Sequence, residues 1–211
     1  MAYKPSYHIT LGLAPTRRDG FPSPKDAFEN KKRVLPKLRE ILAGIPDVEV
    51  VDIEWLNDEG LLVDPMDVPR VAEYFKSRKV DAVFMPHCNY GSEEVVGMLG
   101  KAMEKPFLLW GPRDEAPPSG CVNRYTDTQC GLFGSSAALI AAETSLLLSV
   151  ISTLITKYLL TFLRGLHILT VRKLMFPFFE PNLCPLAGGR LVFFIAAQRG
   201  QTRYAAQLYL H

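Results

Sequence analysis

Several polar side chains that could do chemistry come directly after short apolar segments of the chain. Arg17 and Arg18 follow ITLGLAPT, and their planar guanidinium groups can clamp a hydroxylated or anionic ligand. A solvated basic loop is the alternative, although a position at the end of a strand favours a ligand site. The segment HCNYGSEE follows the apolar run DAVFMP in the same way. It supplies three further candidates for a binding site, which are His87, Asn89 and Tyr90.

Another polar loop, GPRDEAP, follows the apolar segment PFLLW and places an arginine beside two carboxylates. Asp114 and Glu115 could serve acid–base or metal chemistry. A local ion pair with Arg113 explains the same residues without any reaction, so both interpretations stay open at this point. Arg113, Asp114 and Glu115 are therefore candidates for the site as well.

The segment RYTDTQCGLF has the composition of a helix start. Asp127 or Thr128 is the expected N-cap, which gives Asp127 a structural role. Gln129 would then lie in the first turn, where it could face a ligand. Cys130 is expected to be a packed small apolar residue.

Composition and missing motifs exclude several classes of protein. The net charge of +2, without a Lys/Arg-rich run among aromatics, argues against nucleic-acid binding. No GxGxxG or GxxxxGK[ST] turn and no GxSxG or HExxH motif occurs, so nucleotide, serine-hydrolase and zinc-protease sites are not expected. The four cysteines lack CxxC or metal-ligand spacing and the N-terminal segment lacks a signal-peptide pattern, which predicts a reduced cytoplasmic protein.

Apolar periodicity predicts alternating strands and helices over the first part of the chain. YHITLGLAP, VEVVDIEWL, DAVFMPH and PFLLWG are typical of strands, and KDAFENKKRVLPKLREILAGI, DPMDVPRVAEYFKSRK, SEEVVGMLGKAMEK and DTQCGLFGSSAALIAAE are typical of helices. This alternation indicates an α/β fold with a flavodoxin-like, doubly wound parallel sheet. In such a sheet, ligands bind beyond the carboxyl ends of the strands. The candidate residues all follow strands, so we expect them to form one polar rim.

The chain changes character near residue 136. Residues 1–136 hold 20 acidic and 17 basic residues, whereas residues 137–211 hold 2 acidic and 7 basic residues and no aspartate. The second part therefore has far fewer charges than the usual quarter of residues. We interpret residues 1–136 as an α/β domain and residues 137–211 as an atypical apolar tail.

The motifs of the first part resemble a known family. LGLAPTRRD, DIEWLNDEGLL, FMPHCNYGSEE, LLWGPRDEAP and RYTDTQCGLF, in this order and at this spacing, resemble the N-terminal domain of the L-fucose isomerase/L-arabinose isomerase-like family of sugar isomerases. The resemblance covers roughly residues 7–136. It implies a cytoplasmic, oligomeric, usually Mn²⁺-dependent enzyme that interconverts an aldose and a ketose.

The resemblance also implies where the chemistry takes place. The metal would bind two adjacent sugar oxygens, and carboxylates would move a proton between neighbouring carbons. Its Glu, Asp and His ligands are expected in later domains, so we expect no metal or cofactor site in this chain. The N-terminal domain would help to form the sugar pocket, commonly against a neighbouring subunit. By motif, Arg17 or Arg18 and the residues around Cys88 and Asn89 would reach the sugar hydroxyls.

The tail has three possible origins. Residues 144–163 are about long enough for a membrane helix, although Lys157 lies inside them. The tail could be a divergent domain, although it shows no sustained period. A slip of the reading frame near residue 136 explains the joint loss of aspartate, charge and motif best.

Together these patterns predict the N-terminal fragment of a metal-dependent aldose–ketose isomerase that is inactive alone and forms a homo-oligomer in its full-length form. The alternative is a non-catalytic sugar-binding or assembly module, membrane-associated only through residues 144–163.

Overall fold

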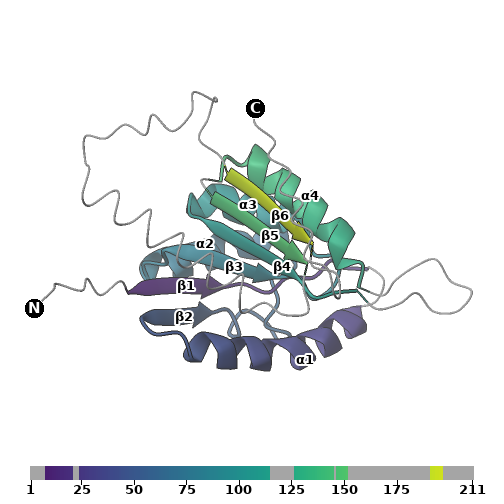
Figure 1. Cartoon of the computed structure of the whole chain (residues 1–211), viewed down its shortest axis with the longest axis horizontal. Helices are drawn as coiled ribbons and strands as arrows, with labels where there is room; N and C mark the ends of the chain where they lie inside the picture. The colour runs from purple at the N-terminus through teal and green to yellow at the C-terminus, as the bar shows by residue number, and fades with distance from the viewer. Residues whose placement is uncertain (1–7, 21–23, 115–125, 145, 152–190, 197–211) are drawn as a thin grey trace, which may run out of the picture.

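The computed structural model describes residues 8–20, 24–114, 126–144, 146–151 and 191–196, and these form one parallel sheet of six strands. Figure 1 shows the strands side by side in the order β2-β1-β3-β4-β5-β6. Strand order reverses at β1 and β3, which is the switch point of a flavodoxin-like sheet. The predicted doubly wound α/β fold is confirmed. The strands are β1 Ile9–Leu13, β2 Val48–Asp52, β3 Ala82–Pro86, β4 Phe107–Gly111, β5 Leu146–Ile151 and β6 Leu191–Ala196.

Helices follow the first four strands where the apolar periodicity predicts them. In Figure 1, α1 runs along the β2 edge of the sheet, and α4 lies beside β5 and β6. Helix α3 contacts both α2 and α4, so these three helices form one layer. The helices are α1 Pro24–Ala43, α2 Val68–Ser77 after the short 3₁₀ helix η1 Pro65–Asp67, α3 Glu93–Met103 and α4 Thr128–Ala141.

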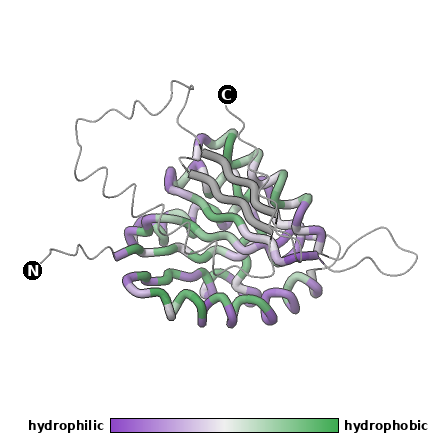
Figure 2. Tube along the Cα trace, in the orientation of Figure 1, coloured by the Kyte–Doolittle hydropathy of each residue, from purple (hydrophilic) through white to green (hydrophobic). Residues whose placement is uncertain are grey.

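Each face of the sheet has its own apolar core. Leu35 and Leu38 of α1 pack with strand residues such as Leu11 and Phe84 in one cluster. Figure 2 shows this helix alternating between apolar and polar residues, as expected for a helix with one buried face. On the other face Phe75 of α2 covers β1 so closely that a Cβ on the glycine at position 12 would lie 2.9 Å from its ring.

The sheet continues past residue 136, where the composition of the chain changes. Ser136 lies inside α4, and β5 pairs with β4 from Leu147 to Ile151. Residues 146–151 also belong to residues 144–163, the segment that is about long enough for a membrane helix. They form strand β5 instead. Residues 152–163 lie outside the described residues. Among the residues that the structure describes, no helix is long and apolar enough to cross a membrane. The division of the chain into two parts stays a prediction.

Candidate functional site

Thr16 joins three loops at the carboxyl ends of β1, β2 and β3. Its backbone N–H donates to the Pro86 carbonyl at 2.9 Å, and its hydroxyl donates to the Leu62 carbonyl at 2.8 Å. The Cys88 N–H in turn donates to the Thr16 carbonyl at 2.8 Å. These bonds hold the loops after the three strands against one another. These three loops therefore meet at the switch point of the sheet, where the sequence predicts a polar rim, and we call this edge the rim.

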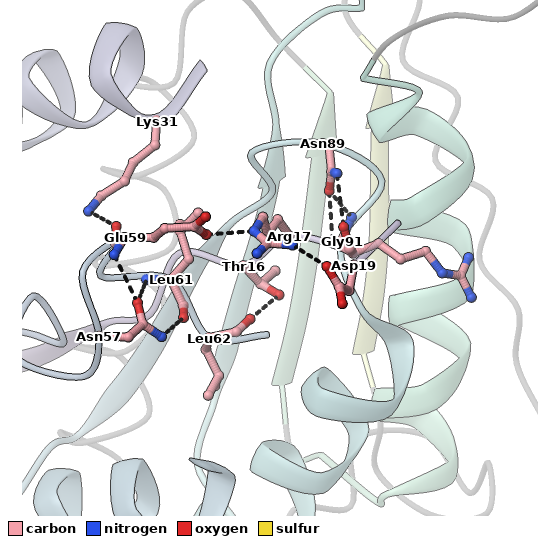
Figure 3. A network of polar contacts seen from close by, with 11 residues as sticks. Thr16, Arg17, Asp19, Lys31, Asn57, Glu59, Leu61, Leu62, Asn89 and Gly91 are labelled. Atoms are coloured by element: carbon pink, nitrogen blue, oxygen red, sulfur yellow. Dashed lines mark hydrogen bonds and ion pairs between the residues drawn. The ribbon is translucent and has the colours of Figure 1, made fainter. Parts of the chain in front are cut away.

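Arg17 is held inside this rim by carboxylates. Figure 3 shows its side chain between Glu59, whose Oε2 lies 2.6 Å from Arg17 Nε, and Asp19, whose Oδ1 lies 3.0 Å from Nη1. Only 11% of the Arg17 side chain is exposed. Burial lowers the pKa of Arg17, but the hydrogen bonds to Glu59 and Asp19 outweigh it and raise the pKa overall. Arg17 therefore braces the loop from within.

Lys31 of α1 fixes the loop after β2 from the other side. Its ammonium group donates to Glu54 Oε2 at 2.9 Å and to the backbone carbonyl of Glu59. Burial raises the pKa of Glu54, but hydrogen bonds from Lys31 and Arg39 outweigh it and lower the pKa overall. Lys31 is almost fully buried, so its charge holds the loop after β2 in place.

Arg18 is the arginine that the rim presents to solvent. Its side chain is 44% exposed, its guanidinium carbon lies 4.7 Å from the centre of the Tyr90 ring, and its Nη2 lies 3.2 Å from Glu93 Oε2. Guanidinium groups stack favourably on aromatic rings, so Tyr90 restricts where Arg18 can move. We call Arg18, Tyr90 and Glu93 the Arg18 cluster. It combines donors, an acceptor and an aromatic face at one exposed place.

Asn89 supports this cluster through hydrogen bonds to the backbone. It is fully buried, and its Oδ1 accepts hydrogen bonds from the backbone N–H groups of Arg18 at 2.8 Å and Gly91 at 3.0 Å. Its Nδ2 donates to the Arg18 carbonyl at 3.2 Å. The sequence predicted a sugar contact for Asn89. That contact stays a prediction, and in this structure the Asn89 side chain satisfies backbone groups of the two loops that carry Arg18 and Tyr90.

His87 and Cys88 lie inside the protein instead of on the exposed surface of the rim. His87 is 1% exposed, and its Nε2 lies 3.3 Å from Ser135 Oγ, while Nδ1 has no hydrogen-bond partner among the described residues. Cys88 is 2% exposed and packs with Ala27 and Leu61. Burial raises the pKa of Cys88 to about 12, so this group stays a thiol and not a reactive thiolate.

His87 should make the stability of the protein depend on pH. Burial lowers its pKa to about 3, compared with about 6.5 in an unfolded chain. Between these values the unfolded chain binds a proton that the folded protein does not, so the free energy of unfolding decreases as the pH falls from about 6.5 towards 3. His87→Gln should reduce this slope by up to about 1.4 kcal/mol per pH unit, as measured by urea unfolding between pH 7 and 4.

The control for this prediction is His8→Gln, because the His8 side chain is 59% exposed. The control should keep the wild-type slope. Equal slopes in wild type and both variants would contradict the burial of a neutral His87.

The loop after β4 starts helix α4. Asp114 Oδ1 accepts from the Thr128 N–H at 2.7 Å and from the Thr126 hydroxyl at 2.9 Å, and its Oδ2 accepts from the Gln129 N–H at 3.3 Å. Asp127 occupies the N-cap position without a side-chain cap bond, so Asp114 does the capping from 14 residues away along the chain. Arg113 and Gln129 are exposed, and the candidate residue 115 lies outside the described residues.

Two glycines of α4 let the helix approach the Arg18 cluster. A Cβ at Gly131 would lie 1.6 Å from the Tyr90 carbonyl oxygen, and a Cβ at Gly134 would lie 2.7 Å from Glu93 Cγ. Sequence reasoning missed both, although the spacing GLFG inside a predicted helix was a usable signal of a close contact. Cys130, expected to be packed, is exposed instead, because α4 turns Gly131 and Leu132 inward.

The described residues do not fit a metal centre. They contain no group of three or more His, Cys, Asp or Glu side chains that could hold a metal ion. The carboxylates of the rim already bind cations of the protein, since Asp19 and Glu59 pair with Arg17 and Glu93 pairs with Arg18. We derive no metal-dependent step from this part of the chain.

Comparison with known proteins identifies the family of the chain. A family model described as the N-terminal domain of fucose/sulfoquinovose isomerase matches residues 12–160, which is more than half of the chain. The match runs from within β1 past the end of β5 and includes the whole described rim. No curated protein and no solved structure matches the chain.

Proposed function

Because the chain belongs to the fucose/sulfoquinovose isomerase family through its N-terminal domain, we propose that its rim forms one wall of the sugar pocket of an aldose–ketose isomerase. The observation that carries this proposal is the Arg18 cluster, which is exposed at the switch point of the sheet. Ligands of doubly wound sheets bind at this place, beyond the carboxyl ends of the strands.

The side chains of the cluster suit a sugar. Arg18 offers N–H donors to hydroxyl oxygens, the Glu93 carboxylate accepts hydrogen bonds from hydroxyl groups, and the Tyr90 ring offers an apolar face for the C–H groups of the sugar. Arg17 supports this wall without touching the ligand, because its side chain is only 11% exposed and its Nε and Nη1 groups bind Glu59 and Asp19. The proposal thus assigns different tasks to the two adjacent arginines.

The rest of the pocket would come from elsewhere. The family resemblance implies a Mn²⁺ ion bound by residues of later domains and an oligomeric full-length enzyme. We propose that the present chain holds and orients the sugar and does not isomerise it alone. The exposure of Arg18 supports an open wall that another domain or subunit completes.

The test is sugar binding to the 211-residue chain. L-Fucose at millimolar concentration should raise the melting temperature of the wild-type protein, and the same samples with Mn²⁺ should show no conversion to the ketose. Arg18→Ala should weaken L-fucose binding about 10- to 100-fold, because a hydrogen bond to a charged group contributes about 1.5–3 kcal/mol.

Arg78→Ala is the matched control. Arg78 is 51% exposed and pairs with Glu49 at 3.4 Å, as Arg18 pairs with Glu93, but it follows α2 at the opposite end of the sheet. Isomerisation of the sugar by the chain alone would contradict the proposal that this chain holds the sugar without isomerising it. A melting temperature that no sugar changes, together with co-purification with an intact family isomerase, would favour the alternative of a non-catalytic assembly module.

A further inference from the structure

Three cations at the loops after β1 and β2, Arg17, Arg18 and Lys31, are each paired with carboxylates. Arg17 pairs with Asp19 and Glu59, and Arg18 pairs with Glu93. The buried ammonium group of Lys31 pairs with Glu54. Anion sites in proteins instead present unpaired guanidinium forks or free backbone N–H groups. The part of the rim around Arg17 and Arg18 is therefore poorly suited to a negatively charged ligand, although it contains two adjacent arginines.

The start of α3 adds to this effect. The N-terminus of a helix attracts anions, but here the first turn holds Glu93 and Glu94, and the Ser92 hydroxyl accepts the Val95 N–H at 3.5 Å. These two carboxylates already interact favourably with the positive end of the helix dipole. An anionic group that bound Arg18 would lie beside the negative charge of Glu93.

Glu93 is held in this position by its surroundings. Its Oε2 pairs with Arg18 at 3.2 Å, while its Oε1 lies where a Cβ on Gly134 would approach to 2.8 Å. The glycine at position 134 therefore leaves space for this carboxylate beside α4. Tyr90 limits the movement of Arg18 on the other side. The side chains of Arg18 and Glu93 are 44% and 29% exposed, so a ligand can reach both members of the pair.

We infer that Glu93 is a specificity-determining residue that makes the rim select neutral sugars over sugars with an anionic substituent. This inference rests on the proposed sugar-binding function. A sugar hydroxyl can accept from Arg18 and donate to Glu93 at the same time, so it complements the ion pair. A sulfonate group only accepts, and it can reach Arg18 only by breaking the pair against the charge of Glu93.

The description of the family names two substrate types together, and Glu93 would distinguish between them. Fucose is a neutral sugar, whereas sulfoquinovose carries a sulfonate. With Glu93 in place, the chain should prefer the neutral sugar. Removal of this one negative charge should weaken the preference without loss of the fold, because glutamine has the same shape as glutamate.

The test compares the dissociation constants of L-fucose and sulfoquinovose for wild type, Glu93→Gln and Glu94→Gln by isothermal titration calorimetry at low salt. The wild type should prefer L-fucose, and Glu93→Gln should shift the ratio of the two constants towards sulfoquinovose by about 10-fold, since a unit charge at contact distance has an effect of this order. Glu94→Gln removes the neighbouring charge of the same helical turn and should leave the ratio unchanged. An unchanged ratio in Glu93→Gln would overturn the inference.

A second measurement keeps the inference testable if the wild type binds neither sugar, a result that would defeat the proposed function. Inorganic sulfate is titrated into ¹⁵N-labelled protein, and the Arg18 Nε–H resonance is followed by NMR after assignment through Arg18→Lys. The resonance should move in Glu93→Gln at sulfate concentrations that leave the wild type unchanged. An equal response of wild type and Glu93→Gln would show that Glu93 does not exclude anions.

Discussion

Gly131→Ala is expected to destabilise the protein by about 2 kcal/mol or more, because overpacking a tight contact costs 1–3 kcal/mol and this contact is backbone against backbone. The new Cβ would lie 1.6 Å from the Tyr90 carbonyl oxygen and 2.5 Å from its carbonyl carbon. Either α4 or the loop after β3 must move. Alanine favours a helix over glycine by about 1 kcal/mol, which offsets only part of this cost.

The same substitution at Gly97 is the control. A Cβ there would lie 3.2 Å from the side chain of Ala138, which is tight, and the nearest backbone atom, the Ala138 carbonyl oxygen, lies at an ordinary contact distance of 3.6 Å. Urea unfolding of both variants should show a large decrease in the midpoint for Gly131→Ala and a change below about 1 kcal/mol for Gly97→Ala. A Gly131→Ala protein as stable as the wild type would contradict the contact between α4 and the loop. If the fold survives, the displaced Tyr90 should also weaken sugar binding.

Asn89→Ala is expected to have an effect of similar size and to change the site as well. The truncation leaves the N–H groups of Arg18 and Gly91 and the carbonyl of Arg18 without their side-chain partner. A buried polar group that loses its partner costs about 1–3 kcal/mol, so the total should reach about 2–4 kcal/mol. Sugar binding should fall together with stability, because Asn89 sets the backbone that presents Arg18.

Asn57 offers a matched control for this prediction. Its Nδ2 donates to the Leu61 carbonyl at 2.9 Å, and its Oδ1 accepts from the N–H groups of Glu59 and Leu61. The pattern is that of Asn89, but Asn57 is exposed, so water can replace the lost bonds. Urea unfolding should therefore show less than half the loss for Asn57→Ala. Equal losses in the two variants would contradict the importance of burial at Asn89.

The second part of the chain contributes strands to the domain. β5 and β6 pair in parallel with each other over Leu146–Ile151 and Leu191–Ala196, and the family match ends between them, at residue 160. The origin of the tail as a frame slip, a membrane segment or a divergent domain stays a prediction. Sequencing the coding DNA through codon 136 and beyond residue 211, with translation of all frames, separates a frame slip from the other two.

The sequence by itself determined the first four strands and four helices and predicted the edge of the sheet where the candidate residues lie. The period of the apolar residues predicts the first four strands and four helices, and α3 starts after its Ser92 cap, at the beginning of the predicted segment SEEVVGMLGKAMEK. These features depend on residues close together in the chain. The rim could also be predicted, because parallel strands with helical crossovers bring all their carboxyl ends to the same edge.

Only the tertiary structure decided what each rim residue does. Arg17 and Arg18 are neighbours of the same type, yet Arg17 is buried by Glu59, which is 42 residues away, and Arg18 is left exposed beside Tyr90. Asn89 supports the Arg18 cluster through hydrogen bonds to a loop that is 71 residues away in the chain. Burial, ion pairing and capping depend on which distant segments meet. Local sequence propensity does not determine which distant segments pack together. Only the tertiary structure therefore shows the contacts of each rim residue.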